Sequence, residues 1–379
     1  MAYLDIYGAL YSDDRKALLR CPLELQGTFM IPEGVTKISG NFWYDKRGYN
    51  EGAFENCKFI ETIIIPASVE KIEDGAFSGT QSLKQIYVDG KNNSFCSNNG
   101  ILYNKEKTEL LWCPEQYVGS LHLDNTVKAI NNSIGNSMVD AICLAEGSEY
   151  YTIIDGILYD KNRTKLLVCP RFKYGVVNIP TGIKAIESRA FKNCLALKTV
   201  VIPDSVQKIG YEAFSNCTAL TNVKLPNAQT KIGPYCFAYC TALSEIVIPP
   251  NVYFEEVGGP LEVELYGTFL NCTGLSKITF MEGREKINGD CADHCIFENC
   301  TSIRTISFPK SLKNLHVHCW GESISEVLVP IGEKKRYLQM LNDNEESIRK
   351  HFRNRIITEE GERFLRTIQK YKDSIEDVK

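Results

Sequence analysis

Three of the five histidines and three of the fifteen cysteines stand close together in the C-terminal third of this 379-residue chain. They occur in CADHC and HVHC, and the six residues are Cys291, His294, Cys295, His316, His318 and Cys319. Thiolate and imidazole are ligands that zinc prefers, so these residues are candidate zinc ligands. The spacing matches no standard zinc finger, and Cys295 also precedes an apolar repeat position, Phe297. We therefore keep a zinc site as an alternative and predict no cofactor.

No other stretch carries a recognisable catalytic pattern. The chain contains no phosphate-binding loop, no Gly-x-Gly-x-x-Gly, no His-Glu-x-x-His and no Gly-x-Ser-x-Gly. The adjacent acids Glu255 and Glu256 fall on a predicted loop, where a solvated surface explains them without an acid and base pair. We predict that the protein is not an enzyme.

Nine cysteines occupy repeated positions in the sequence. Six follow phenylalanine by three residues and three precede a proline at the end of another motif, and these are Cys57, Cys194, Cys217, Cys240, Cys272 and Cys300, then Cys21, Cys113 and Cys169. Free cysteine packs as a small apolar side chain, so regular placement favours a buried row of thiols. A disulfide framework is the other interpretation.

A repeated unit positions these cysteines. A phenylalanine, often preceded by alanine, recurs as Phe54, Phe77, Phe191, Phe214, Phe237, Phe269 and Phe297. Three of the steps between them are 23 residues long, and the last two are 32 and 28 residues long. A fixed period in this range is the signature of stacked structural repeats.

The unit from Leu197 to Cys217, LKTVVIPDSVQKIGYEAFSNC, shows what each position must do. Val200 and Ile202 alternate with outward residues, which predicts a short half-buried strand that Pro203 ends. One such coil buries little alone, but coils stacked at about 4.8 Å join their apolar residues into one core and pair their strands into a parallel sheet. We predict an α/β, β-rich solenoid with a parallel sheet on one face.

The pattern L-x-x-I-x-I-P-x-x-V-x-x-I-x-x-x-A-F-x-x-C resembles the BspA-like (treponemal) class of leucine-rich repeats, over roughly residues 20 to 332. The resemblance implies a curved array of repeats used as a binding or adhesion scaffold. It also implies a bacterial surface or secreted protein of uncharacterised role. An interaction scaffold in the cytosol is the alternative.

A fifteen-residue motif occurs three times, as GALYSDDRKALLRCP, GILYNKEKTELLWCP and GILYDKNRTKLLVCP. Two apolar segments flank a polar turn in each copy, which predicts β-hairpins at about residues 8–22, 100–114 and 156–170. The chain returns from Cys21 and Cys169 to a repeat proline after eleven residues in both cases. We therefore predict that the hairpins are inserts within a leucine-rich-repeat solenoid spanning residues 1–332. Their varied turns are a possible second binding surface.

The repeat stops after Val329 and Pro330, and residues 333–379 have no strand signal. Phe364, Leu365, Ile368 and Ile375 recur at helical spacing, and Thr358 fits a helix start. We predict a helical C-terminal cap that closes the open end of the core. A partner-binding helix is the alternative.

The outer face of the predicted sheet is the candidate binding site. Its residues mix apolar, hydroxyl and charged side chains without the basic stripe that phosphate binding requires. They are Thr62, Ile64, Gln85, Tyr87, Thr199, Val201, Asn222, Lys224, Glu245, Val247, Lys277, Thr279, Thr305 and Ser307. An open surface with apolar spots favours a protein or peptide ligand over a small molecule. Strand preference alone is the competing explanation for these residue types.

The composition also restricts the classes of partner that the chain is expected to bind. The formal net charge is −4, which gives no general electrostatic reason to bind nucleic acid. No apolar run reaches the roughly 18 residues that a membrane-spanning helix needs, and the start of the chain does not read as a signal peptide. We expect an extracellular or cell-surface location from the family resemblance, with a cytoplasmic location as the alternative.

Overall fold

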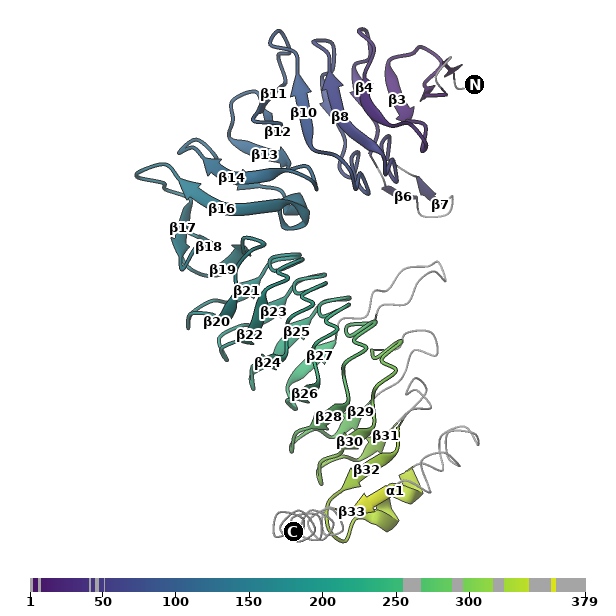
Figure 1. Cartoon of the computed structure of the whole chain (residues 1–379), viewed down its shortest axis with the longest axis vertical. Coiled ribbons are helices and arrows are strands. Elements are labelled where there is room, and N and C mark those ends of the chain that lie inside the picture. Colours follow the sequence, from purple (N-terminus) through teal and green to yellow (C-terminus); the bar gives the residue numbers. More distant parts are fainter. Residues whose placement is uncertain are drawn as a thin grey trace, which may run out of the picture. The chain divides into compact units, whose positions relative to one another are not determined.

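The computed structural model describes residues 3–5, 8–40, 42–44, 48–50, 52–254, 267–287, 296–315, 324–340 and 356–358. The chain divides into two units, which we describe separately (Figure 1). Unit 1 contains residues 1–162 and 168–171, and unit 2 contains residues 163–167 and 172–379. In both units the described residues are rich in short strands that pair in parallel.

Each repeat of unit 1 supplies two strands rather than one. The longer strands form what we call the front sheets, namely β4 (Gly27–Met30), β8 (Ile60–Ile65) and β10 (Gln85–Val88), with β14 (Val118–Leu123) and β16 (Met138–Leu144). The shorter strands form the back sheets, namely β3 (Ala17–Arg20), β5 (Lys37–Ile38) and β9 (Lys71–Ile72), with β13 (Glu109–Trp112) and β15 (Ala129–Ile130). Ile63 and Ile38, one from each sheet, are both fully buried, so the core lies between front and back sheets.

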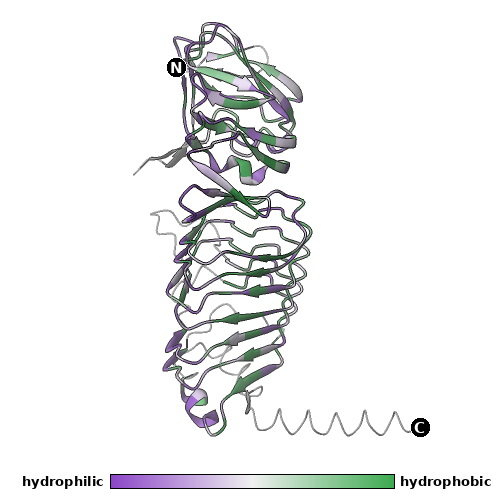
Figure 2. Cartoon of the chain, turned by 90° about the vertical axis from the view of Figure 1, so that its left-hand side faces the viewer, coloured by the Kyte–Doolittle hydropathy of each residue, from purple (hydrophilic) through white to green (hydrophobic). Residues whose placement is uncertain are grey.

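Unit 2 has the same two kinds of sheet. Its front sheets contain β20 (Gly175–Asn178), β22 (Leu197–Val201) and β24 (Asn222–Lys224), then β26 (Glu245–Ile248), β28 (Lys277–Phe280), β30 (Thr305–Ser307) and β32 (Glu326–Val329). Its back sheets contain β19 (Lys165–Val168), β21 (Ala185–Ile186), β23 (Lys208–Ile209), β25 (Thr230–Ile232) and β27 (Val252–Phe254), then β29 (Lys286–Ile287) and β31 (Asn314–Leu315). Figure 2 shows hydrophobic residues recurring from strand to strand. The prediction of one sheet on one face was therefore incomplete, since parallel strands lie on two faces.

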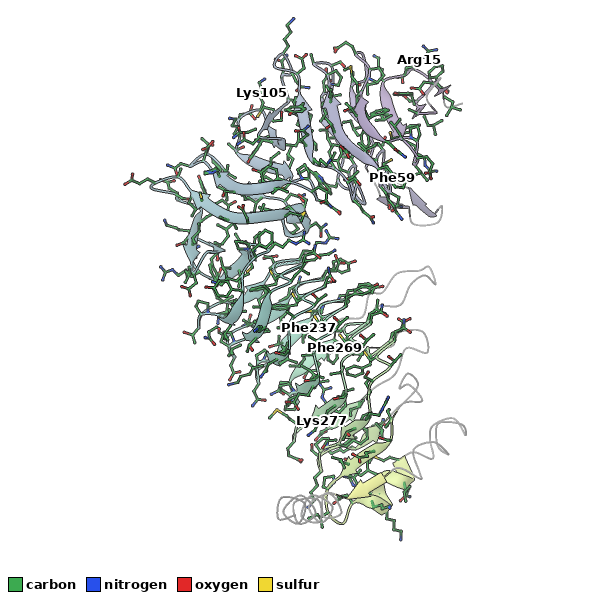
Figure 3. All side chains as sticks on the ribbon, in the orientation of Figure 1. Arg15, Phe59, Lys105, Phe237, Phe269 and Lys277 are labelled. Atoms are coloured by element: carbon green, nitrogen blue, oxygen red, sulfur yellow. The ribbon has the colours of Figure 1, made fainter. Side chains whose placement is uncertain are left out.

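Stacked phenylalanines fill the interior of unit 2. The ring centroids of Phe191 and Phe214 are 4.7 Å apart, and those of Phe214 and Phe237 are 5.2 Å apart. The row continues through Phe269 to Phe297 at 5.3 and 5.2 Å (Figure 3 labels Phe237 and Phe269). These separations are close to the spacing between neighbouring strands, because each repeat contributes one ring.

The repeat cysteines are buried in the core, as the sequence predicted. All nine are free and buried. The thiol of Cys217 donates to the carbonyl oxygen of Phe191 at 3.1 Å, and the thiol of Cys240 donates to that of Phe214 at 3.2 Å. The Phe214 carbonyl also accepts the backbone N–H of Cys217 at 3.3 Å. Both acceptor positions of this buried carbonyl are therefore used.

The Asn-Cys pairs of the sequence have a backbone explanation. Asn193 and Asn216 have φ values of 62° and 61°, and Asn271 and Asn299 have similar positive values. Asparagine tolerates the left-handed region better than most residues do, so it suits this turn. In unit 1, Gly79 takes the same place with φ 72°.

The first two repeated motifs form antiparallel hairpins, β2 (Leu10–Tyr11) with β3 and β12 (Ile101–Asn104) with β13, and in the third β18 (Ile157–Asp160) lies next to β19 in the sheet. A further antiparallel strand precedes each motif, so that β1 (Tyr3–Leu4) pairs with β2, β11 (Phe95–Asn98) with β12, and β17 (Tyr151–Ile154) with β18. The returning strands β3, β13 and β19 then enter the back sheets, where Leu18 pairs with Ile38 and Leu110 with Ile130. A further hairpin joins β6 (Phe42–Tyr44) to β7 (Gly48–Asn50), and β15 leads into η1 (Asn132–Asn136).

The segment predicted to be a helical cap contains a helix and a strand. Helix α1 (Lys334–Met340) buries Tyr337, whose ring stacks on Phe308 at 5.7 Å and whose hydroxyl donates to the Pro309 carbonyl. Strand β33 (Ile356–Thr358) then pairs in parallel with β32 and extends the front sheet. The prediction of a wholly helical segment was therefore wrong. The predicted helical positions from Phe364 to Ile375 lie outside the described residues.

Candidate functional site

The front sheet of unit 1 presents two outward rows. Thr28, Thr62 and Gln85 are in register, and so are Met30, Ile64 and Tyr87. Met30 is 66% exposed and Tyr87 is 47% exposed, and the Tyr87 hydroxyl is 2.8 Å from Oε1 of Gln85. The second row is therefore a short apolar strip bordered by polar side chains.

The predicted binding surface needs a correction at Thr62, which is buried. The strand register places it in the outward row, but only 9% of it is exposed. Its hydroxyl accepts a hydrogen bond from Nε2 of Gln85 at 3.2 Å, and strands flank it on both sides. Thr62 therefore contributes little to any contact with a ligand.

In unit 2 the outward rows run across both front sheets. Thr199 is in register with Asn222, and Val201 with Lys224. Glu245, Lys277 and Thr305 are in register, as are Val247, Thr279 and Ser307. Val247 is 43% exposed, and Lys277 (labelled in Figure 3) is partly exposed.

Charges of both signs alternate on this face of unit 2. Lys224 and Glu245 are exposed on neighbouring repeats, and Lys277 is paired in register with Glu245. The hydroxyl of Thr305 donates to Oε2 of Glu326 at 3.2 Å, which extends the polar row onto β32. The face therefore has no single-sign stripe of the kind that binds a phosphate backbone.

Two exposed apolar residues of these rows were missed from the sequence. Met30 on β4 and Val176 on β20 both lie in outward rows, in register with Ile64 and Thr199 respectively. Both strands follow a hairpin and lack the leucine that begins the other repeats. The sequence did contain a signal for both strands, namely the constant distance of eleven residues from the hairpin cysteine to the next repeat proline.

Burial disfavours the thiolate form of two repeat cysteines, Cys113 and Cys240. Burial raises the pKa of Cys113 to about 12, although Ser137 opposes this shift, and burial likewise raises the pKa of Cys240 to about 12. Thiols with such values are neutral near pH 7, whereas the thiolate is the reactive and metal-binding form.

The candidate zinc ligands Cys291, His294, Cys295, His316, His318 and Cys319 all lie outside the described residues, and so do Glu255 and Glu256. Within the ranges that the structure describes, no group of three or more His, Cys, Asp or Glu side chains is arranged to hold a metal ion. The zinc hypothesis therefore stays a prediction.

A sequence profile described as a BspA type leucine-rich repeat region matches residues 49–109, 171–258 and 264–335 in six copies, together more than half of the chain. The chain belongs to this family. Membership indicates a protein-interaction scaffold, of a class that is generally non-catalytic and typical of bacterial surface proteins. No curated protein matches the chain.

Solved structures of similar fold include the pneumococcal vaccine antigen PcpA, with 17% identity, a TM-score of 0.55 and coverage of 94% of this chain and 98% of that one. A leucine rich cell surface protein from Faecalibacterium prausnitzii shows 20% identity, a TM-score of 0.44 and coverage of 81% and 94%. The T. pallidum leucine rich repeat protein shows 19% identity, a TM-score of 0.35 and coverage of 53% and 97%. The first of these supports the fold of this BspA-type chain. No helix in its described part is long and apolar enough to span a membrane.

Proposed function

We propose that this BspA-type protein is a recognition scaffold that binds a protein or peptide through the outward rows of its front sheets, at the cell surface or outside the cell. The family supports a binding role, and the mixed character of the rows supports a proteinaceous ligand. Solvent-exposed apolar side chains bordered by polar ones are typical of interaction sites.

The observation that carries this proposal is the exposure of apolar residues at regular outward positions. Val247 in unit 2 shares its row with the polar Thr279 and Ser307, which satisfy strand geometry equally well. Tyr87 in unit 1 continues an exposed row that also contains Met30 and Ile64. Large exposed tyrosines also contribute strongly to protein interfaces, because they bury much area at a low entropic cost. Strand preference does not require an apolar residue at these solvent-facing sites.

A pull-down with quantitative mass spectrometry tests the proposal. We compare the wild type with a front-sheet variant carrying Tyr87→Ser, Val201→Ser and Val247→Ser. We expect the variant to keep its fold by circular dichroism and to lose the partners that the wild type captures from host-cell surface extracts.

The matched control carries Phe59→Ser, Leu195→Ser and Tyr239→Ser, which are also exposed hydrophobic residues but lie in turns. We expect this control to retain the wild-type partners. If both variants capture the same proteins as the wild type, the front sheets are not the binding site.

A further inference from the structure

Two buried cysteines of unit 1 meet where the N-terminal hairpin joins the first repeat. Cys21 follows strand β3 directly, and Cys57 lies three residues after Phe54. The two cysteines are 1% and 0% exposed, and their thiols are hydrogen-bonded to each other. Both are free thiols in the structure. Two thiols in contact are in the arrangement from which a disulfide forms with little movement of the backbone.

Cys21 occupies the place that a phenylalanine has in the next repeat. The N–H of Cys21 donates to the Ala53 carbonyl at 2.7 Å, just as the N–H of Phe54 donates to the Ala76 carbonyl at 2.9 Å. A small side chain therefore stands where the repeat pattern places an aromatic ring. The position points into the core, which brings its thiol against Cys57.

The carbonyl contacts of the Cys57 thiol are long. Its sulfur lies 3.7 and 3.8 Å from the carbonyl oxygens of Cys21 and Pro22. In unit 2 the thiols of Cys272 and Cys300 are also in contact, but they donate to phenylalanine carbonyls at 3.1 and 3.0 Å. A disulfide between those two would break two short hydrogen bonds, whereas one at Cys57 breaks only weak contacts. Oxidation is therefore favoured at the pair in unit 1.

A second junction in unit 1 has the same arrangement with only one thiol. Cys113 follows strand β13 as Cys21 follows β3, and Ser137 holds the place of Cys57. The Ser137 hydroxyl donates to the Ile134 carbonyl at 2.6 Å and is hydrogen-bonded to the Cys113 thiol. Because serine cannot form a disulfide, this junction is a natural reference for the first one.

The two thiols of the pair differ in reactivity. The hydrogen bond with Cys21 lowers the pKa of Cys57, and the charge of Arg20 adds to this against the effect of burial. The same hydrogen bond, together with burial, raises the pKa of Cys21. The thiolate is the nucleophile in thiol and disulfide exchange, so Cys57 is the thiol that reacts first.

We infer that Cys21 and Cys57 form a disulfide when the chain folds in an oxidising compartment. The Cys57 thiolate attacks a small disulfide oxidant such as oxidised glutathione, which forms a mixed disulfide and releases one thiol. Cys21 then loses its proton, attacks the Cys57 sulfur and displaces the second thiol. The two cysteines lose two electrons in total, and the oxidant becomes two thiols. Because both sulfurs are buried in the folded chain, this exchange takes place while the first repeat is still open.

The disulfide fastens the N-terminal hairpin to the first repeat. Cys21 and Cys57 are 36 residues apart, so the bond restricts a long segment of the unfolded chain and thereby stabilises the folded state. The hairpin also supplies the first strands of the back sheet, in the order β1, β2, β3, β5, β9. Formation of the bond in the organism rests on the extracellular location proposed above, whereas the geometry of the pair does not.

Refolding of the full chain from urea in a mixture of reduced and oxidised glutathione tests the pair. After the remaining thiols are alkylated, trypsin releases Cys21 in peptide 21–37 and Cys57 in peptide 48–58, each with a single cysteine. We expect mass spectrometry of the unreduced digest to show these two peptides joined as the main cross-linked species. We also expect the oxidised chain to unfold about 5 °C or more above the reduced chain.

Exchanges between cysteine and serine locate the effect. Cys57→Ser copies the junction at Cys113 and should abolish the difference in unfolding temperature between oxidised and reduced chains. Cys240→Ser removes a buried thiol of unit 2 and should leave that difference in place. Ser137→Cys should add a second cross-link, to Cys113, and should raise the unfolding temperature of the oxidised chain further.

The inference is overturned if Cys21 and Cys57 stay reduced under these conditions, or if cross-links spread over the cysteines without preference for this pair. A Cys57→Ser chain that keeps the redox-dependent shift would also overturn it. If that variant does not fold, the peptide map of the wild type still decides the question. Binding by the front sheets is not measured in this experiment, so its outcome is independent of the proposed protein-binding role.

Discussion

The aromatic cores of the two units differ in regularity. In unit 2 the interplanar angles of successive rings from Phe191 to Phe297 are 13°, 7°, 10° and 15°. In unit 1, Phe29 meets Phe54 edge-on at 78°, and Phe77 meets Trp112 at 51°. The difference follows the sequence, because unit 1 alternates repeats with hairpins whereas unit 2 stacks one repeat upon the next.

Uniform repeats, rather than aromatic residues as such, therefore produce parallel stacking of the rings. Phe54 and Phe77 are separated by one 23-residue repeat, and their rings are close to parallel at 21°. Where a hairpin intervenes after Phe77, a tryptophan from its returning strand takes the next place and tilts. Four pairs of substitutions test how the two units differ.

The largest expected effect is on the phenylalanine row. Phe214→Ala removes a fully buried ring that stacks on two others, and we expect a loss of about 3–5 kcal/mol in the free energy of unfolding. Phe77→Ala should cost less, because the tilted Trp112 ring can shift towards the space. Urea unfolding followed by circular dichroism measures both. Equal losses would contradict the link between regular stacking and stability.

The thiol hydrogen bonds rank second. Cys217→Ala removes a buried side chain and its bond to Phe191, so we expect a loss of about 1–2 kcal/mol. Thr80 occupies the corresponding place in unit 1, where its buried hydroxyl donates at 2.7 Å to the carbonyl of Phe77 in its own repeat and not to the preceding repeat. A threonine at this position thus still finds a backbone acceptor. Cys217→Thr should therefore cost less than Cys217→Ala in the same urea experiment. The reverse order would show that the bond does not matter.

The third contrast concerns two carboxylates and their dependence on pH. Burial acts to raise the pKa of Glu212, but Lys192 and Arg189, whose nitrogens are each 2.8 Å from Oε2, outweigh it and lower the pKa. The folded state therefore gains stability above the ordinary glutamate value of about 4.3, and this gain is lost as the pH falls through the lower folded pKa.

Glu212→Gln should cost about 1 kcal/mol at pH 7 and should flatten the decline of stability between neutral and strongly acidic pH. Glu73→Gln in unit 1 should behave in the same way, since Lys37, the Gly40 N–H and Lys71 lower the pKa of Glu73 against the effect of burial. Thermal unfolding over a pH series measures both variants. An unchanged pH profile in Glu212→Gln would contradict the assignment.

The smallest effect is expected at the left-handed turn. Asn216→Ala should cost about 0.5–1 kcal/mol, because alanine enters this backbone region less readily than asparagine does. Asn216→Gly should be close to neutral, since Gly79 already fills the same turn position in unit 1. Thermal unfolding distinguishes the two. A glycine variant as destabilised as the alanine variant would show that the Asn216 side chain, which donates to Asn193 at 2.8 Å, dominates instead.

Much of the fold could be predicted because its signals are local and repeated. The spacing of the phenylalanines located the core, and the cysteines three residues later were correctly assigned to it. The back sheets escaped prediction because a strand such as Lys208–Ile209 has only two residues. Such a strand shows no alternation of its own and exists only because the next repeat pairs with it.

The surface was harder to predict than the core for the same reason. The strand register that pairs Thr62 with Gln85 depends on the neighbouring repeat, and so does the packing that buries Thr230. Neither property follows from the residue type alone. Strand β33 likewise contains the β-branched pair Ile356 and Ile357 within a charged segment, and the edge of β32 offers it a partner. In each of these places, contacts with the neighbouring repeat determine the local structure.

The thiol to carbonyl bond also has a consequence for how such a chain lengthens. The thiols of Cys217, Cys240, Cys272 and Cys300 each donate to the carbonyl of the phenylalanine in the preceding repeat, so every bond crosses one repeat boundary in the same direction. A duplicated repeat therefore arrives with a donor for the repeat before it and an acceptor for the repeat after it. Recombination that adds or deletes whole repeats leaves no unsatisfied group at the junction, so the number of repeats can change during evolution while the core chemistry stays the same.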